Sequence, residues 1–251
     1  MGMPAAPPMS HTIPSTYFLA KPPIPSTIVP PIDNPKKEII IAVMGPAGAG
    51  KSYFIREMIA GISQSDIELC ETSGWTKVRS FSFPYGPTKI TLFDTPDFRN
   101  AGTGDYEMLA EISDWMSSAY RQGTLLSGII YLHNIHWLHE NFWATEHLMM
   151  FQKLCGPSAL QNVLLTTTQW SNANLAAEES RENTLRTSSH WRELITGGAA
   201  VKRFMGTRES GLELIDQLIK KEPKPLLIQH QMVDEDMILE ETDVGQCMGW
   251  T

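Results

Sequence analysis

The sequence predicts an α/β domain built on a mostly parallel β-sheet, with a layer of helices on each face and one antiparallel hairpin strand. Short runs of apolar residues alternate with longer segments whose apolar residues recur at helical spacing, a pattern typical of strands followed by covering helices. A glycine-rich stretch at residues 45–50 joins the first strand to the first helix. A chain of 251 residues is long enough for one such domain with extensions.

The first elements are the most clearly patterned. Residues 38–44 predict a strand, in which a continuous apolar run follows Glu38, typical of a parallel strand buried on both faces. After the glycine-rich stretch, apolar residues from Phe54 to Ile62 lie on one stripe of a helix. Residues 77–83 and 88–94 predict a hairpin, because the Pro-Tyr-Gly-Pro segment between them favours a turn.

The alternation of helices and strands continues toward the C-terminus. An apolar stripe predicts a helix over 108–119, which ends at Gly123. The remaining predicted elements are strand 127–133, helix 145–154, strand 162–168, a helix over 176–195 with a break near Ser188, strand 200–204 and helix 209–221. The folded domain is therefore expected to span residues 37–228.

The two ends of the chain differ from this domain in composition. Residues 1–36 are rich in proline and predict a disordered tail. Residues 229–251 contain acidic residues but no Lys or Arg, and they predict a solvated acidic tail. Much of the formal net charge of -8 lies there. The domain itself is close to neutral, so we expect no nucleic acid bound through a broad basic face.

Cysteine spacing and hydropathy bear on the compartment. Cys70, Cys155 and Cys247 lie far apart and are odd in number, which indicates a reducing environment and no disulfide framework. No apolar run approaches the ~20 residues of a membrane-spanning helix. We therefore expect a cytoplasmic protein without a membrane span.

Residues 45–52 fit the P-loop pattern of Gly, four residues, then Gly-Lys-Ser. Small residues let successive backbone N–H groups curl around a phosphate, and the following helix directs the positive end of its dipole at the same anion. Lys51 is expected to reach the β- and γ-phosphate oxygens, and the Ser52 hydroxyl to bind Mg²⁺. The predicted nucleotide-binding residues here are Gly45, Pro46, Ala47, Gly48, Ala49, Gly50, Lys51, Ser52 and Tyr53.

A second acidic element follows the predicted strand 88–94. Asp94 ends this strand and is followed by Thr-Pro-Asp. A carboxylate at the C-terminal end of the strand beside a P-loop can hold a metal-bound water. Asp94 is therefore predicted to contribute to the magnesium site and, together with Lys51, to catalysis.

The order of these motifs resembles that of a known family. The P-loop, the hairpin and Asp-Thr-Pro are followed by Ser-Gly-Ile-Ile-Tyr-Leu-His at 127–133 and Arg-Glu-Ser at 208–210. Over about residues 38–220, the chain resembles the fungal G-domain-containing P-loop GTPases, which are related to septins and immunity-associated GTPases. The resemblance implies a Ras-like G domain that binds GTP or GDP with Mg²⁺. It also implies a first-switch threonine that binds the metal, either Thr72 or Thr76, of which we prefer Thr72.

The chain departs from the family pattern at two places. Asp97 replaces the glycine of Asp-Thr-Pro-Gly, and Phe98 follows it where Ras-like switches carry a water-orienting glutamine. The guanine-reading Asn/Thr-Lys-x-Asp motif is absent, and Ser171 stands where its carboxylate would be. Thr168 and Trp170, at the end of the same strand, remain candidate nucleotide contacts, although packing is an equally good interpretation of Trp170.

The resemblance leads us to expect a slow GTPase switch, and two alternatives stay open. One alternative is a nucleotide-binding scaffold without turnover, and the other is an ATP-using P-loop protein. Asp97 and the missing base motif favour the first of them. A second copy of the chain is a candidate partner, since it could supply a catalytic group across a dimer. His133, His136 and His139 lack a recognised metal-ligand pattern, so we interpret them as a polar loop at the top of the sheet.

Overall fold

The computed structural model describes residues 38–71, 78–95, 103–137, 142–171 and 173–249. The chain divides into two units, Met1–Pro35 and Lys36–Thr251, and every described residue belongs to the second. The proline-rich tail predicted for residues 1–36 therefore lies outside the described residues.

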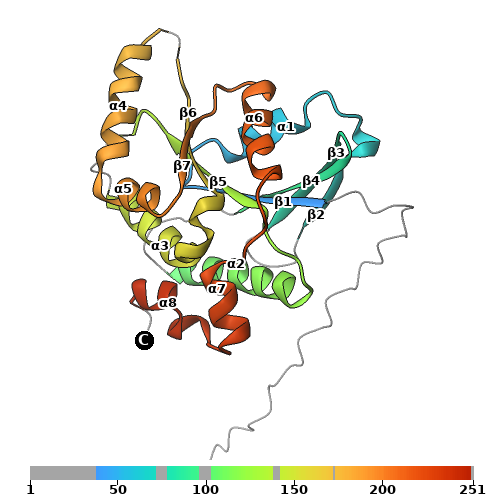
Figure 1. The fold of residues 1–251 in the computed structure, drawn as a ribbon, viewed down its shortest axis with the longest axis vertical. Helices are drawn as coiled ribbons and strands as arrows, with labels where there is room; N and C mark the ends of the chain where they lie inside the picture. The colour runs from blue at the N-terminus through green and yellow to red at the C-terminus, as the bar shows by residue number, and fades with distance from the viewer. Residues whose placement is uncertain (1–37, 72–77, 96–102, 138–141, 172, 250–251) are drawn as a thin grey trace, which may run out of the picture. The chain divides into compact units, whose positions relative to one another are not determined.

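Within the described ranges, seven strands form one sheet in the order β2-β3-β4-β1-β5-β6-β7 (Figure 1). The strands are β1 (Glu38–Met44), β2 (Glu68–Glu71), β3 (Arg79–Tyr85), β4 (Thr88–Asp94), β5 (Gly128–Asn134), β6 (Val163–Thr168) and β7 (Ala200–Arg203). β3 pairs antiparallel with β2 and β4, and the other neighbouring pairs are parallel. The predicted mostly parallel sheet with one antiparallel hairpin strand is confirmed.

Helices cover both faces of this sheet. They are α1 (Lys51–Ile59), α2 (Thr103–Arg121), α3 (Phe142–Ala159), α4 (Leu175–Thr187), α5 (Ser189–Thr196), α6 (Arg208–Ile219), α7 (Leu227–Gln229) and α8 (Asp243–Cys247). Shorter helical turns are η1 (Gln64–Asp66), η2 (Leu160–Asn162), η3 (His230–Asp234) and η4 (Leu239–Glu241). The break predicted near Ser188 is confirmed, because Ser188 has extended backbone angles between α4 and α5. None of the helices in the described part of the chain is long and apolar enough to cross a membrane.

The strand β1 divides the core into two layers. Ile39, Ile41 and Val43 face one side, where they pack in a cluster with residues of α1 and α6. Ile40, Ala42 and Met44 face the other side and pack with residues of α2 and α3. Figure 1 shows α1 and α6 on one face of the sheet and α2 and α3 on the opposite face. The continuous apolar run of β1 is thus explained by burial on both faces.

The hairpin edge of the sheet differs from the prediction in two details. β2, which was not predicted, is a short edge strand with four exposed residues, so it has no buried face to produce an apolar pattern. β3 continues through Pro84 to Tyr85, and β4 resumes at Thr88. The turn is therefore shorter than the predicted segment and centres on Gly86, whose φ is 56°.

The C-terminal segment, residues 226–249, packs on the domain where we expected a solvated acidic tail. Ile228, Leu239 and Val244 are buried in the same cluster as residues of α2 and α3. Two tyrosines of α2 donate hydrogen bonds to acidic residues of the C-terminal segment. The Tyr106 hydroxyl donates to Glu240, and the Tyr120 hydroxyl donates to Asp234 at 2.9 Å. The expectation of full solvation was wrong because these apolar residues are irregularly spaced and give no helical or strand period.

Candidate functional site

The P-loop begins where β1 ends. Gly45, Gly48 and Gly50 have φ values of 136°, 79° and 100°, which residues other than glycine rarely adopt. A Cβ atom on Gly45 would lie 2.3 Å from the carbonyl oxygen of Leu132 in β5. Glycine at this position therefore lets the loop backbone pack directly against the neighbouring parallel strand.

Lys51 is the first residue of α1, and its side chain is buried. Its Nζ donates to the carbonyl oxygens of Gly45 at 2.6 Å and Pro46 at 3.3 Å, which places the ammonium group against the start of the loop. Ser52 and Tyr53 follow and are exposed. The first backbone N–H groups of a helix have no intrahelical acceptors, and its dipole is positive there. The loop and the start of α1 can therefore bind a polyanion.

Asp94 lies beside the P-loop on the neighbouring strand. It ends β4 and is aligned with Val43 of β1, two residues before the loop. Its side chain is buried, and Oδ2 accepts a hydrogen bond of 2.9 Å from Nη2 of Arg79 on β3. The Thr95 hydroxyl donates to the carbonyl oxygen of Val43 at 3.0 Å, which fixes the chain just after Asp94.

The oxygen donors at this end of the sheet fit Mg²⁺. This ion usually takes one or two carboxylates or hydroxyls from a protein and completes its shell with phosphate oxygens and water. Ser52 offers an exposed hydroxyl and Asp94 a carboxylate. No group of three or more His, Cys, Asp or Glu suited to a metal exists among the described residues. The donors thus suit a metal that completes its shell with water or phosphate oxygens rather than one held in an all-protein cage.

The end of β6 braces the P-loop through side chains. The Thr168 hydroxyl donates to the carbonyl oxygen of Ala49 at 2.8 Å. The Gln169 amide donates to that of Gly48 at 2.9 Å. Gln169 has a φ of 62°, an uncommon conformation for a residue other than glycine. The last residue of a parallel strand and the residue after it therefore hold the loop in place.

A cavity of about 410 Å³ adjoins the P-loop. It lies among the start of α1, the loop after β6 and the loop after β7, and its lining residues are Gly50, Tyr53, Thr168, Gln169, Trp170, Phe204, Met205 and Gly206. The Tyr53 hydroxyl donates to the carbonyl oxygen of Gly206 at 2.9 Å and links two of its walls. The predicted residues Gly50, Tyr53, Thr168 and Trp170 are thus brought together.

Sequence reasoning missed four residues of this cavity, namely Gln169, Phe204, Met205 and Gly206. All four directly follow the carboxyl ends of β6 and β7. In open α/β sheets, ligands bind outside the carboxyl ends of the strands. That rule was the available signal, and it applies to every loop at this end of the sheet.

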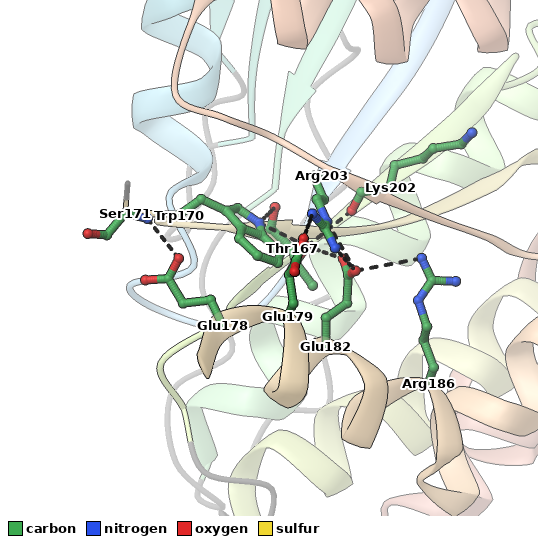
Figure 2. A network of polar contacts seen from close by, with 9 residues as sticks. All are labelled: Thr167, Trp170, Ser171, Glu178, Glu179, Glu182, Arg186, Lys202 and Arg203. Atoms are coloured by element: carbon green, nitrogen blue, oxygen red, sulfur yellow. Dashed lines mark hydrogen bonds and ion pairs between the residues drawn. The ribbon is translucent and has the colours of Figure 1, made fainter. Parts of the chain in front are cut away.

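The wall at Trp170 is supported by Arg203 and by carboxylates of α4 (Figure 2). The Arg203 guanidinium lies 4.2 Å from the centre of the Trp170 ring. Arg203 is bonded to the buried Glu182 at 2.7 Å and to Glu179 at 3.1 Å, and the bond to Glu182 raises the pKa of Arg203. Glu178, also buried, accepts from the backbone N–H of Ser171 at 2.9 Å. The α4 carboxylates therefore order the loop after β6, and none of them lines the cavity.

The loop after β5 borders the site. The interpretation of His133 as part of a polar loop was wrong, because His133 lies within β5. Its side chain is buried, and its ring packs edge-on against Trp137 and Trp191. His136 contacts the carbonyl oxygen of Gln169 through Nε2 at 2.9 Å. Trp137 lies beside Gly48 of the P-loop, where an added Cβ would be 3.5 Å away. His136 thus contacts a wall of the cavity at Gln169.

Several predicted residues lie outside the described residues. These are the two switch threonine candidates, two switch residues after Thr95 and one histidine: Thr72, Thr76, Asp97, Phe98 and His139. Their roles remain predictions from sequence.

The P-loop, the aspartate ending the adjacent strand and the strand order define a P-loop α/β fold of the G-domain type. A structure of the chloroplast translocon components atToc33 and psToc159, concerned with dimerisation and GTPase activity, matches with 16% identity and a TM-score of 0.52, covering 76% of this chain and 86% of that chain. At this identity the likeness shows the fold alone.

Two further solved structures have lower TM-scores. The G domain of the FeoB iron transporter of T. maritima matches with 14% identity and a TM-score of 0.46, over 72% of this chain and 96% of that chain. Toc33 from Arabidopsis thaliana, in complex with Mg²⁺ and GMPPNP, matches with 16% identity and a TM-score of 0.48, over 68% and 72%. No family model matches the chain, and no curated protein does.

Proposed function

We propose that the chain binds GTP and GDP with Mg²⁺ and acts as a slow GTPase switch. The observation that carries this proposal is the continuity of the two halves of the site. Gly50 belongs both to the P-loop and to the cavity lining. Thr168 and Gln169 line the cavity and also bond carbonyl oxygens of the loop. One nucleotide can therefore place its phosphates on the loop and its base in the cavity.

The residues of the loop take separate roles in this proposal. Lys51 and the backbone amides bind the phosphates and neutralise charge on the γ-phosphate as water attacks in line. Ser52 and Thr72 would bind Mg²⁺, and Asp94 would support it through a metal-bound water. The bound metal supplies further neutralisation of phosphate charge. The GTPase activity named for the translocon components supports this assignment by analogy of fold.

The base preference follows from what the cavity lacks. Guanine presents N–H donors on its ring edge, which a carboxylate at the position of Ser171 would accept. The lining residues include no Asp or Glu. The family resemblance leads us to expect GTP to bind better than ATP, and the missing acceptor makes the expected margin smaller than with an intact specificity motif. The same neutral lining favours a second candidate function, an ATP-using P-loop protein.

Substituting Ser171 tests the position of the base. Ser171 directly follows the lining residue Trp170 but does not itself line the cavity. If the base reaches this position, Ser171→Asp supplies the missing acceptor and should raise the preference for GTP over ATP about tenfold, the effect of one charge-assisted hydrogen bond. Ser171→Asn, of similar size but uncharged, is the matched control. Affinities of labelled GTP, GDP and ATP with and without Mg²⁺ provide the measurement. A wild-type protein that binds ATP as tightly as GTP would establish the second candidate instead.

The nucleotide-binding scaffold without turnover remains the rival to the switch. Phe98, which can neither donate nor accept a proton, favours it. A homodimer is proposed as the assembly that would restore turnover, because a second copy can supply an arginine. The kinship with septins and immunity-associated GTPases and the cytoplasmic location are also proposals, and they rest on the sequence.

A further inference from the structure

The carboxylate predicted to support Mg²⁺ already has a cationic partner within the chain. Arg79 and Asp94 are directly opposite each other on the antiparallel strands β3 and β4. Residues in such positions have their side chains on the same face and close together. Nη2 of Arg79 lies 2.9 Å from Oδ2 of Asp94, and the side chains are 42% and 8% exposed. The carboxylate is therefore the buried member of the pair, and the guanidinium reaches it from the solvent side.

Burial makes a counter-charge at Asp94 necessary. An ionised carboxylate removed from water is costly unless a cation or hydrogen-bond donors compensate it. Arg79 gives that compensation through a charge-assisted hydrogen bond. A magnesium ion beside the P-loop would interact with the same carboxylate, so Mg²⁺ and the Arg79 guanidinium would share one anionic group.

We propose that Arg79 is an internal counter-ion of the magnesium site that competes with Mg²⁺ for Asp94. Mg²⁺ must weaken or displace the Arg79 contact, which lowers the apparent affinity for the metal. In return, Arg79 keeps Asp94 neutralised beside the phosphates when Mg²⁺ is scarce, so nucleotide binding depends less on the metal. This inference rests on the proposed function for its nucleotide part. Its metal part needs only Mg²⁺ and the chain.

The competition can be tested without nucleotide by measuring the melting temperature of the full chain against Mg²⁺ at constant ionic strength. Arg79→Gln removes the counter-ion and is expected to melt below wild type and to regain stability as Mg²⁺ is added. Lys89→Gln is the matched control, because it removes one positive charge at the opposite end of the same strand pair, where Lys89 bonds Glu68. Arg79→Lys keeps the charge and should stay close to wild type, which guards against misfolding of the glutamine variant.

The Asp94 dependence is the decisive comparison. Replacing Asp94 by Asn in the Arg79→Gln background should abolish the added response to Mg²⁺. A response of Arg79→Gln no larger than that of Lys89→Gln would overturn the proposal. The proposal would also be overturned if the Arg79→Gln, Asp94→Asn double variant gained as much stability from Mg²⁺ as Arg79→Gln alone.

Binding of labelled GDP then separates this proposal from the proposed function. With Arg79→Gln, the Mg²⁺ concentration that gives half-maximal GDP retention should fall about fivefold, the size of one exposed ion pair. Retention in EDTA should fall as well. If wild type binds no GDP but Arg79→Gln still responds to Mg²⁺ through Asp94, the nucleotide function fails and the role of Arg79 stands. An unchanged Mg²⁺ requirement in a protein that does bind GDP would refute the role of Arg79 alone.

Discussion

At the scale of single residues, the two ends of the P-loop are tied to each other. The ammonium group of Lys51 donates to the carbonyl oxygen of Gly45, and Gly45 packs against Leu132 of the next strand. The constraint at Gly45 is steric and conformational, whereas that at Lys51 is one of charge. Substitutions at the two positions should therefore fail in different assays, one in folding and the other in binding.

Lys51→Ala should weaken triphosphate binding about 10- to 150-fold, because it removes a charged hydrogen bond to phosphate worth about 1.5–3 kcal/mol. Lys153→Ala is the control, since Lys153 lies on α3 with a half-exposed side chain. Calorimetric titration with GTP gives the affinities, and circular dichroism checks the fold. Equal GTP affinities for the two variants would remove Lys51 from the phosphate site.

Gly45→Ala should destabilise the domain by about 2–6 kcal/mol, the sum of backbone strain and overpacking against Leu132. Gly61→Ala separates the two costs. Gly61 also has a positive φ, 76°, but an added Cβ there would meet nothing within 4 Å. Its cost should be only about 1–2 kcal/mol. Urea unfolding measures both, and similar losses would show that the contact with Leu132 can relax.

At the scale of elements, the packing of the C-terminal segment was not predicted from the sequence. Its acidic residues are at the surface, while Leu239 and Val244 join the core beneath α2 and α3. Gln229 donates to the carbonyl oxygen of Met116 in α2 at 2.9 Å. Buried apolar contacts and a hydrogen bond to a helix backbone both indicate a docked element rather than a solvated one.

Two adjacent residues test this docking. Leu239→Ala should cost about 2–5 kcal/mol in the free energy of unfolding, because Leu239 is 5% exposed. Ile238→Ala should cost less than about 0.5 kcal/mol, since Ile238 is 59% exposed. Chemical denaturation of both variants gives the comparison. If neither substitution changed the free energy of unfolding, the segment would contribute nothing to the stability of the fold.

The elements also show what a sequence can predict. The strand β1, the P-loop and α1 were predictable because each has a local pattern: an apolar run, a glycine spacing and a helical stripe. The short edge strand β2 and the packing of Leu239 were not, since both depend on partners distant in the chain. The same applies to the site. Lys51 and Asp94 stand in motifs, whereas Gln169 and Met205 line the cavity only because β6 and β7 end beside α1.

At the scale of the whole molecule, the site collects loops from several parallel strands at one end of the sheet. β1 leads into the P-loop, β4 ends in Asp94, and β6 and β7 lead into the cavity walls. Candidate groups for phosphate, metal and base therefore meet at this end of the sheet among the described residues, whereas Thr72 lies outside them. We have assigned no described residue the role of orienting the attacking water.

The concentration dependence of GTP hydrolysis separates the switch from the scaffold. With Phe98 after Asp97, intrinsic turnover is expected on the order of 10⁻⁴ s⁻¹ or slower, the scale of an unassisted small GTPase. An arginine supplied across a dimer could add about 10³–10⁵-fold. Single-turnover hydrolysis of GTP, measured over a range of protein concentrations, distinguishes the outcomes. A rate that rises with concentration supports a dimer-activated GTPase, and a flat, barely measurable rate supports the scaffold. Fast hydrolysis independent of concentration would contradict the role given to Phe98, because one monomer would then contain its own water-orienting group.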